Sequence, residues 1–364
     1  GSLMSIFGVT AMLSYLPGGW IADRVSPRIL LTSSLLLTGF SGFYFATLPS
    51  YAVSLAIHAV WGITITLLFW GSLIRVTRNW APKNEQGKAF GILQTGRGLS
   101  ELSTSIIMLA IFGWLGSNIF ALSVVIILFS VLIIISGILA WFIIDDDADG
   151  KNDSKNFQTK GFKDIITVLK MPIVWLIAVV ILTAYAAYWG TLRFTSYSSD
   201  IFSMSVTMAA AISVGKMWMN PPASLIAGFI SDKIGIAKSI AILFIALIAS
   251  FTVFAFMPGL PALLPFMIIN VAFASLAIFA IRAIYFALLE EGGVPMAITG
   301  TAAGFVSMIG FTPDIFMPLL GGMLLDAIPG PAGYRLFFLS VVGICVIGLI
   351  ATLMICRIIA SKNV

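Results

Sequence analysis

The sequence has few charged residues. Asp, Glu, Lys and Arg make up only 10% of its 364 residues, whereas 60% are hydrophobic. A soluble domain of average composition carries about 25% charged residues, so this chain has too few of them to cover a set of soluble domains. We therefore predict an integral membrane protein that crosses the bilayer many times.

Cysteine and histidine are also scarce, which excludes two classes of site. Cys345 and Cys356 are the only cysteines, and both fall in one late apolar segment, so there is no disulfide framework. A single histidine, His58, argues against a histidine-rich metal centre. The sequence contains no Walker-type phosphate loop, no His-Glu-x-x-His and no Gly-x-Ser-x-Gly. We expect no ATP hydrolysis, no enzymatic activity, no metal and no cofactor.

Long apolar segments fill most of the chain, and each is long enough to cross a membrane as a helix. Five precede a polar stretch at 145–170 and six follow it. The odd total leads us to expect one further span before residue 1. The predicted spans are 3–22, 28–48, 51–79, 89–114, 118–144, 171–197, 204–230, 237–257, 261–289, 296–327 and 334–358.

The polar stretch at 145–170 is predicted to be a cytoplasmic linker between two bundles. The amino-terminal bundle covers 1–144 and is taken as helices 2–6; the carboxyl-terminal bundle covers 171–364 and is taken as helices 7–12. A short interfacial helix is expected at 162–169. Charge runs in linkers are usually solvated, and a calcium site is the alternative interpretation of Asp145, Asp146, Asp147 and Asp149.

Most of the 20 Lys and Arg residues lie on alternate connections between the predicted spans, and only Arg193 and Arg335 lie on the others. Short basic loops stay in the cytoplasm, so the first set of connections is predicted to be cytoplasmic. The net charge of +5 therefore reflects membrane topology, and nucleic acid is not needed to explain it. We expect a monomeric, multi-pass protein of the bacterial inner membrane.

The two halves share sequence patterns in the same order, which indicates an internal duplication. Gly19-x-x-x-Asp23-Arg24 recurs as Gly228-x-x-x-Asp232-Lys233. Farther along, 87–91 matches 300–304, with a glycine at both ends of each run. Two parallel repeats of six spans are a known transporter plan, in which the solute binds near the midplane between the halves.

The run from Gly19 to Arg28 resembles the loop signature Gly-x-x-x-Asp-Arg/Lys-x-Gly of the major facilitator superfamily, although Ser26 replaces its later glycine. The repeat from Gly228 to Gly235 fits that signature better. The resemblance covers essentially the whole chain. It implies an all-α membrane fold of two pseudo-symmetric six-helix bundles, and a loop that acts as a latch on the cytoplasmic side.

The latch has a physical interpretation. A glycine lets neighbouring helices approach closely, and the Asp23 carboxylate is expected near a helix N-terminus, where it attracts a cation such as Arg75 or Arg78. The predicted gating residues are Gly19, Asp23, Arg24, Arg75, Arg78, Gly228, Asp232 and Lys233. The alternative is that Asp23 and Arg24 are only topological charges.

Two other short sequence motifs indicate to which subfamily of the superfamily the chain is similar. His58-x-x-Trp61-Gly62 stands where drug/proton antiporters of the superfamily often carry Arg-x-x-Gln-Gly, which argues against a drug exporter. The run Gln94-Thr95-Gly96-Arg97-Gly98 resembles one found in bacterial permeases for sugar acids or organophosphates of the YihN type.

Five charged residues fall inside predicted spans: Arg97, Glu101, Lys216, Arg282 and Asp314. A charge at the bilayer centre costs at least about 2.5–3.5 kcal/mol, so each needs a partner or a function. The repeat aligns Glu101 with Asp314, and we predict that both carboxylates lie at one depth and couple protons. Arg97 can pair with Glu101 four residues later. The alternative is that these groups only set helix packing.

The three interior cations outnumber the two carboxylates, which favours an anionic or zwitterionic solute. The predicted binding residues are Arg97, Lys216, Arg282, Tyr185, Trp189 and Tyr285. Two alternatives stay open: Arg282 pairs with Glu290 or with the Asp232 loop as a gate, and the aromatic residues serve packing or anchoring at the lipid interface. Pro221 and Pro222 are predicted to kink the helix after Lys216.

The predicted function is secondary active transport of a small organic solute by alternating access, driven by protons or by an exchanged anion. Two alternatives remain. One is an antiporter that exports a drug, a metabolite or a siderophore. The other is a transporter-like sensor that carries no flux.

Overall fold

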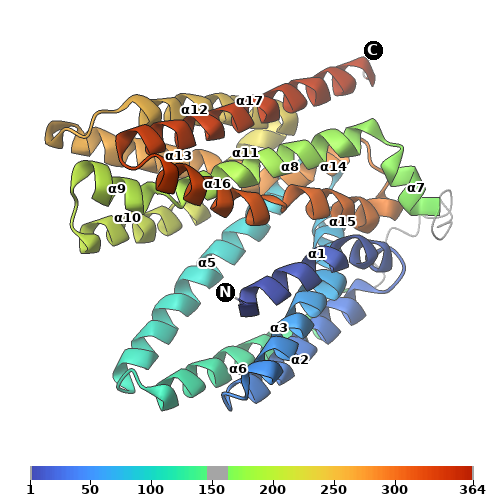
Figure 1. Cartoon of the computed structure of the whole chain (residues 1–364). Helices are drawn as coiled ribbons and strands as arrows, with labels where there is room; N and C mark the ends of the chain where they lie inside the picture. Colours follow the sequence, from blue (N-terminus) through green and yellow to red (C-terminus); the bar gives the residue numbers. More distant parts are fainter. Residues whose placement is uncertain (1, 146–162, 363–364) are drawn as a thin grey trace. The chain divides into compact units, whose positions relative to one another are not determined.

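A computed structural model describes residues 2–145 and 163–362 of the chain. All regular secondary structure in these residues is helical (Figure 1), which confirms the predicted all-α class. Helices are the expected solution for a chain this apolar, because a helix satisfies its own backbone hydrogen-bonding groups in a solvent that offers none.

The first half folds into α1 (Ser2–Ala22), α2 (Pro27–Phe45), α3 (Tyr51–Ile63), the π-helical segment η1 (Thr64–Trp70), α4 (Gly71–Trp80), the short η2 (Lys83–Glu85), α5 (Gln86–Trp114) and α6 (Ile119–Ile143). Side-chain caps mark two of the starts: Ser26 accepts the amide of Ile29, and Asn118 accepts the amide of Ala121. The short α7 (Lys163–Leu169) stands where an interfacial helix was expected at 162–169.

The second half contains α8 (Pro172–Thr191), α9 (Phe194–Phe202), α10 (Val206–Trp218), α11 (Asn220–Ile234), α12 (Ile236–Phe256), η3 (Pro261–Leu263), α13 (Leu264–Ile284), η4 (Tyr285–Ala287), α14 (Leu288–Glu291), η5 (Met296–Ile298), α15 (Thr299–Gly310), α16 (Pro313–Ala327) and α17 (Pro331–Lys362). Several predicted spans are thus built from two consecutive helices rather than one.

Every predicted span corresponds to one of these helices or to a consecutive run of them. Within the described residues, eight are long and apolar enough to cross a membrane by length and composition. The other three predicted spans are α2, α5 and the pair α10–α11. These hold more polar residues, among them Arg97 and Glu101 in α5 and Lys216 at the end of α10.

The helices form two compact units, which we describe separately. Unit 1 contains Gly1–Ala81, Glu101–Met171 and Gly293–Met308; unit 2 contains Pro82–Ser100, Pro172–Gly292 and Ile309–Val364. Each unit therefore includes a short segment from the other half of the sequence, 293–308 in unit 1 and 82–100 in unit 2. The division into bundles at 1–144 and 171–364 with a linker at 145–170 stays a prediction.

In unit 1, α2 runs along α6 and α1 runs along α3 (Figure 1). Small residues make the close contacts: Gly42 faces the Ser130 side chain, and Gly62 lies against α1 near Thr10. The outward face of α6 is exposed and apolar, with Phe142 and Ile143 largely uncovered. Such a face suits a lipid environment, where helix association depends on close packing rather than on burial from water.

In unit 2, α12 runs alongside α17, and α17 also packs on α8. An aromatic cluster fills the space at one end of these helices: Phe194, Phe251, Phe254 and Phe338 pack with ring centroids 4.5–6.4 Å apart. All four rings are almost fully buried. Aromatic pairs at these separations are favourable beyond the area they bury, so this cluster stabilises the packing of α9, α12 and α17.

Three helical runs of unit 2 are interrupted: α8 ends at Thr191 before α9, α10 ends at Trp218 before α11, and α13 gives way to η4 at Tyr285. In addition, α15, most of which belongs to unit 1, ends at Gly310 before α16. Prolines explain two of the breaks, because Pro221 and Pro313 stand at the start of α11 and α16 and cannot continue a preceding helix. The helix is broken at the position of the predicted kink after Lys216.

The linker is only partly described. Asp146, Asp147 and Asp149, on which the calcium alternative depends, lie outside the described residues. At its far end, Asp164 in the first turn of α7 forms an ion pair of 2.5 Å with Arg24, just after α1. This contact attaches α7 to the end of α1.

Candidate functional site

The first copy of the duplicated motif binds the start of a helix from the second repeat. The buried Asp23 carboxylate accepts the backbone N–H of Gly300 (2.6 Å) and of Thr301 (2.7 Å), and also the Thr301 hydroxyl (2.6 Å). Both amides lie in the first turn of α15, where unsatisfied N–H groups favour an anion. Asp23 therefore acts as an N-terminal cap supplied from a distant part of the chain.

The second copy repeats this arrangement in unit 2. The Asp232 carboxylate accepts the backbone N–H of Gly87 (2.7 Å) and of Lys88 (2.8 Å), in the first turn of α5. Gly87 and Lys88 are the residues that the sequence repeat aligns with Gly300 and Thr301. Each motif thus caps the equivalent helix of the other repeat, and we call these two contacts the paired caps.

Glycines make the paired caps possible. A β-carbon on Gly19 would overlap the carbonyl oxygen of Gly300, and one on Gly228 would lie 2.6 Å from the carbonyl oxygen of Gly87. Real side chains do not approach backbone atoms this closely, so only glycine permits the two helix crossings. The glycine contacts hold each helix start within reach of the neighbouring carboxylate.

The arginines near Asp23 act differently from the expectation. Among the described residues no arginine forms an ion pair with Asp23, because two amides and a hydroxyl already satisfy the carboxylate. Arg75 donates to the Ala22 carbonyl and acts on Asp23 only through its charge. Arg78, which is 1% exposed, donates to the Thr299 hydroxyl (2.6 Å) and to the Val294 carbonyl (2.5 Å). Arg78 thus fixes the segment that leads into α15.

The outer charges of the two motifs differ in their surroundings. Arg24 lies over the Trp20 ring at 4.1 Å and pairs with Asp164. Lys233, its counterpart in the repeat, is exposed. The cation at this position is therefore bound by neighbouring residues in the first copy (Arg24) and exposed in the second copy (Lys233).

Unit 2 also gathers most of the interior residues that the sequence predicted for solute binding. Lys216 ends α10, Arg282 lies near the end of α13, and Asp314 begins α16. Tyr185 and Trp189 come from the last turns of α8. Each of these helices is interrupted beside the residue in question, so backbone groups and side chains meet at one place. We call this group, with Tyr188 and Tyr285, the polar cluster.

Two cations of the polar cluster surround one aromatic ring. The Arg282 guanidinium lies 4.1 Å from the Tyr188 ring centroid and 5.7 Å from that of Tyr185, and the Lys216 ammonium lies 5.8 Å from that of Tyr188. Lys216, which is 6% exposed, donates to the Thr191 hydroxyl (3.3 Å) and carbonyl (3.4 Å). Cations over ring faces are attracted by the ring quadrupole, but neither of these charges is neutralised by it.

The two cations have no carboxylate partner in the part of the chain that the structure describes. The Nε–H group of Arg282 is buried and donates to no partner there either. The alternative partners of Arg282 have other contacts here: Glu290 pairs with Lys83, and Asp232 caps α5. A buried donor without a partner is costly, and an incoming anion would satisfy it.

Asp314, the carboxylate of the polar cluster, is hydrogen-bonded to two aromatic side chains. Asp314 accepts the Trp189 indole N–H (2.9 Å) and a hydrogen bond from the Tyr185 hydroxyl. Asp314 is exposed, and it lies in the first turn of α16, where the helix dipole favours a negative charge. Tyr285 is hydrogen-bonded to Arg282 three residues before it, as their spacing predicts.

Two predicted residues have other neighbours. Arg97 is exposed, donates to the Gln94 amide oxygen (3.1 Å) and acts through its charge on Tyr285. The Glu101 carboxylate forms no ion pair or hydrogen bond with any residue described, so the expected pair with Arg97 is absent. Glu101 belongs to unit 1 and Asp314 to unit 2, and their common depth stays a prediction.

Sequence reasoning missed the central ring and one acceptor of the cluster. Neither Tyr188 nor Thr191 is in the predicted binding set. Tyr188 follows Tyr185 at i+3, and Thr191 follows Tyr188 at i+3. That periodicity is the signal that could have found them.

Comparison with known proteins identifies the family. The family model described as Major Facilitator Superfamily matches residues 1–311. The chain belongs to the Major Facilitator Superfamily. This membership makes it a transporter rather than an enzyme.

Two curated relatives come from Escherichia coli strain K12. Inner membrane protein YihN is 28% identical over 93% of this chain and 82% of its own length. Inner membrane protein YqcE is 29% identical over 96% of this chain and 83% of its own length. The resemblance to YihN-type proteins is confirmed, and with its many spans this superfamily member is a multi-pass inner membrane protein.

Solved structures of the superfamily share the fold. The transporter FucP in its outward conformation superposes with a TM-score of 0.77 at 14% identity, over 96% of this chain and 89% of that one. The human organic anion transporter MFSD10 gives a TM-score of 0.72 at 13% identity, over 97% and 83% of the two chains. At these identities the likeness shows the fold alone.

The glycine contacts predict that two glycines of α1 differ in how their substitution by alanine affects stability. We expect Gly19→Ala to lower the free energy of unfolding by about 1–3 kcal/mol, because its methyl group would overlap the α15 backbone. Gly8→Ala, in the same helix, meets nothing within 4 Å and should be neutral or stabilising by up to about 1 kcal/mol. Thermal unfolding in detergent measures both. Equal effects for the two substitutions would contradict the close crossing.

The Asp23 cap predicts a response to pH. Burial raises the pKa of Asp23 from 3.8 to about 6, whereas an uncapped Asp23 in water would keep the lower value. The folded protein therefore binds a proton at Asp23 more tightly than the unfolded chain does, so this contribution to stability grows on acidification from pH 7 towards about 4 and is lost as the pH rises through about 6. We expect protection of the Gly300 and Thr301 amides from hydrogen exchange, corrected for intrinsic rates, to increase on acidification.

The matched variants for this measurement are Asp23→Asn and Asp232→Asn. Asp23→Asn should remove the pH dependence at Gly300 and Thr301, because the titrating group is lost. Asp232→Asn caps a different helix and should leave that dependence intact. A pH dependence that survives in Asp23→Asn would assign it to another group.

Proposed function

We propose that this superfamily member carries a small organic anion across the inner membrane by alternating access, with proton coupling at Asp314. One observation supports the proposal above all: Lys216 and Arg282 lie around Tyr188 with no carboxylate partner among the described residues. Buried cations of this kind are functional by default in a membrane protein. A carboxylate or phosphate is the ligand that they would bind most strongly.

The surroundings of the cations support an organic anion rather than a bare inorganic ion. Tyr185, Tyr188 and Trp189 provide ring faces and three polar tips within one helix end. Rings of this kind pack on apolar or sugar-like parts of a solute while their polar atoms stay hydrogen-bonded. The interrupted helices agree with this, because transporters of several folds bind substrate where helices are broken near the midplane.

Asp314 supports the coupling step. Its carboxylate is exposed, so protons can reach it, and it is bonded to Trp189 and Tyr185 beside the cations. Protonation would weaken its hold on these two donors and change the charge next to the bound anion. One structural neighbour, FucP, is described as a fucose:proton symporter, which makes proton coupling a reasonable first test.

The full chain in proteoliposomes tests the proposal. With an inward proton gradient we expect uptake of D-glucuronate or glucose 6-phosphate, and weaker or no uptake of neutral fucose or of a lipophilic drug cation. Export of the drug cation alone would contradict an anion carrier and favour the antiporter. Absence of flux with every probe, including amino acids, would favour a sensor.

The binding prediction concerns Lys216 and Arg282. Each substitution, Lys216→Ala and Arg282→Ala, should raise the Kd for the transported anion about tenfold or more, because hydrogen bonds to charged groups contribute about 1.5–3 kcal/mol. Arg335→Ala is the matched control, since Arg335 also lies over a ring, that of Phe256, outside the cluster. Calorimetry on detergent-purified protein measures the three variants. Unchanged affinity in both cluster variants would eliminate the anion site.

The coupling prediction concerns Asp314. Asp314→Asn should abolish accumulation driven by the pH gradient while substrate exchange across the membrane continues, because an amide cannot carry the proton. Asp326→Asn, on the same helix and also exposed, is the matched control. Glu101→Gln tests the second predicted carboxylate in the same assay. Gradient-driven accumulation that persists in Asp314→Asn would remove this residue from the coupling step.

A further inference from the structure

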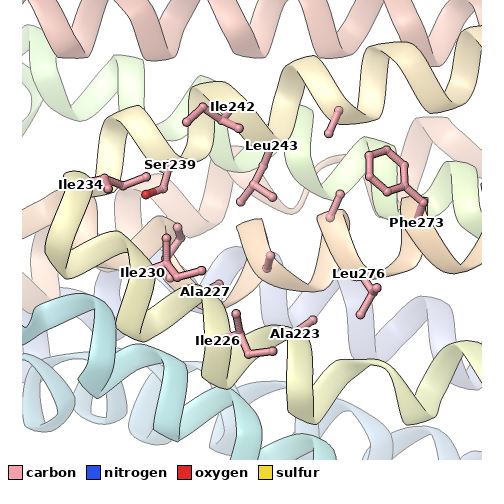
Figure 2. A pocket seen from close by; sticks show the side chains of 14 residues that line it. Ala223, Ile226, Ala227, Ile230, Ile234, Ser239, Ile242, Leu243, Phe273 and Leu276 are labelled. Atoms are coloured by element: carbon pink, nitrogen blue, oxygen red, sulfur yellow. The ribbon is translucent and has the colours of Figure 1, made fainter.

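A groove of about 390 Å³ lies between α11, α12 and α13 of unit 2. Figure 2 shows side chains of these helices around it, with Ile230 and Ala227 of α11 across from Leu243 of α12. Alanines at 223, 227 and 277 leave the space, and larger residues such as Ile226, Ile242 and Phe273 border it. The groove is part of the outer surface of the unit and shares no lining residue with the polar cluster.

The lining of the groove is hydrocarbon. Ser239 is its one polar side chain, and the Ser239 hydroxyl already donates to the Gly235 carbonyl (2.8 Å). Several of the lining residues are also exposed, with Ile226 at 56% and Ile242 at 57%. A surface of this chemistry offers nothing to a polar solute, so the occupant must present an apolar part.

The length of the groove matches one leaflet of a bilayer. Its lining extends from Ala223 to Ile234 on α11 and from Phe273 to Ile284 on α13, which at 1.5 Å per residue is about 16 Å on each helix. Half of a hydrocarbon core of about 30 Å is about 15 Å. The groove begins at the α11–α12 connection, which the basic residues assign to the cytoplasmic side.

Two lysines stand at the cytoplasmic end of the groove. Lys233 comes three residues after Ile230, and Lys238 four residues before Ile242, so each continues the helix face that lines the groove. Both lysines are exposed, and neither forms an ion pair or hydrogen bond with any residue that the structure describes. The nearby Glu291 carboxylate accepts the amides of Ile236 and Ala237 instead.

We propose that this groove is a binding site for an anionic phospholipid of the cytoplasmic leaflet, with one acyl chain in the groove and the phosphate at Lys233 and Lys238. The apolar lining selects a hydrocarbon chain, the length selects one leaflet, and the two unpaired charges select an anionic headgroup. Lysines near the cytoplasmic surface attract anionic lipids in general. This site does not depend on the proposed transport activity.

A second copy of the chain would also cover an apolar groove, but the charges disfavour it. Two copies meeting at this face would bring four lysines together, and the groove lining offers no acidic residue to offset their charge. Glu291 acts on Lys238 through its charge, but its carboxylate is bonded to the amides of Ile236 and Ala237. The lipid is therefore the occupant that complements both the shape and the charge.

Native mass spectrometry of the full chain tests the site. The purified protein is exchanged into detergent with equal amounts of phosphatidylglycerol and phosphatidylcholine. We expect the unaltered chain to retain phosphatidylglycerol several-fold more than phosphatidylcholine. The double variant Lys233→Gln/Lys238→Gln should retain the two lipids equally. The matched control Lys163→Gln/Lys170→Gln removes the same charge from exposed lysines of the same predicted side and should keep the preference.

A second pair of variants tests the groove itself. Ala227→Leu and Ala277→Leu fill the floor and should reduce retention of both lipids while thermal unfolding stays near that of the unaltered chain. Equal retention of phosphatidylglycerol by the unaltered chain and by the lysine double variant would overturn the proposal. So would a dimer mass without bound lipid that disappears in Ala227→Leu, because that result assigns the groove to a second copy.

Discussion

The rest of the structure depends on a carboxylate at the N-terminus of a helix that belongs to the other repeat. Asp23 binds the start of α15 and Asp232 binds the start of α5, each through two successive amide N–H groups. Without the two carboxylates these amides would lack a partner at the helix crossings, and an unsatisfied buried backbone group is costly. The two contacts therefore stabilise the starts of α15 and α5.

This constraint explains why each compact unit includes a segment of the opposite half. Residues 293–308 join unit 1 because Asp23, Arg78 and Trp70 all bind them, the last through a hydrogen bond to Ser307. Residues 82–100 join unit 2 through Asp232 and the contact of Gly228 with Gly87 and Gly91. The two caps thus link the two halves of the duplicated sequence through hydrogen bonds from backbone amides.

The charged residues of the polar cluster lie at interrupted helices, within predicted spans where the bilayer disfavours a charge. Lys216 finds the hydroxyl and carbonyl of Thr191 because α8 ends there and frees its last carbonyl groups. The Arg282 guanidinium lies over the Tyr188 ring. The Asp314 carboxylate is stabilised by the dipole of α16 and by the hydrogen bond that Trp189 donates. The helix ends thus lower the cost of three charges without cancelling them, which keeps the cations available to a ligand. By contrast, α12 is continuous; it lines the apolar groove and contributes rings to the aromatic cluster.

The sequence alone determined the class, the spans and the duplicated motif, because apolar length and local residue spacing dictate helices in a membrane. It also selected Lys216, Arg282 and Asp314, since a charge in an apolar run is conspicuous without a structure. Only the tertiary structure decided the partners: that Asp23 is satisfied by amides rather than by an arginine, that two cations lie near the Tyr188 ring, and that the Glu101 carboxylate has no partner within the described chain. Partners depend on which helix ends meet in space, and residue spacing within one helix carries no information about its neighbours.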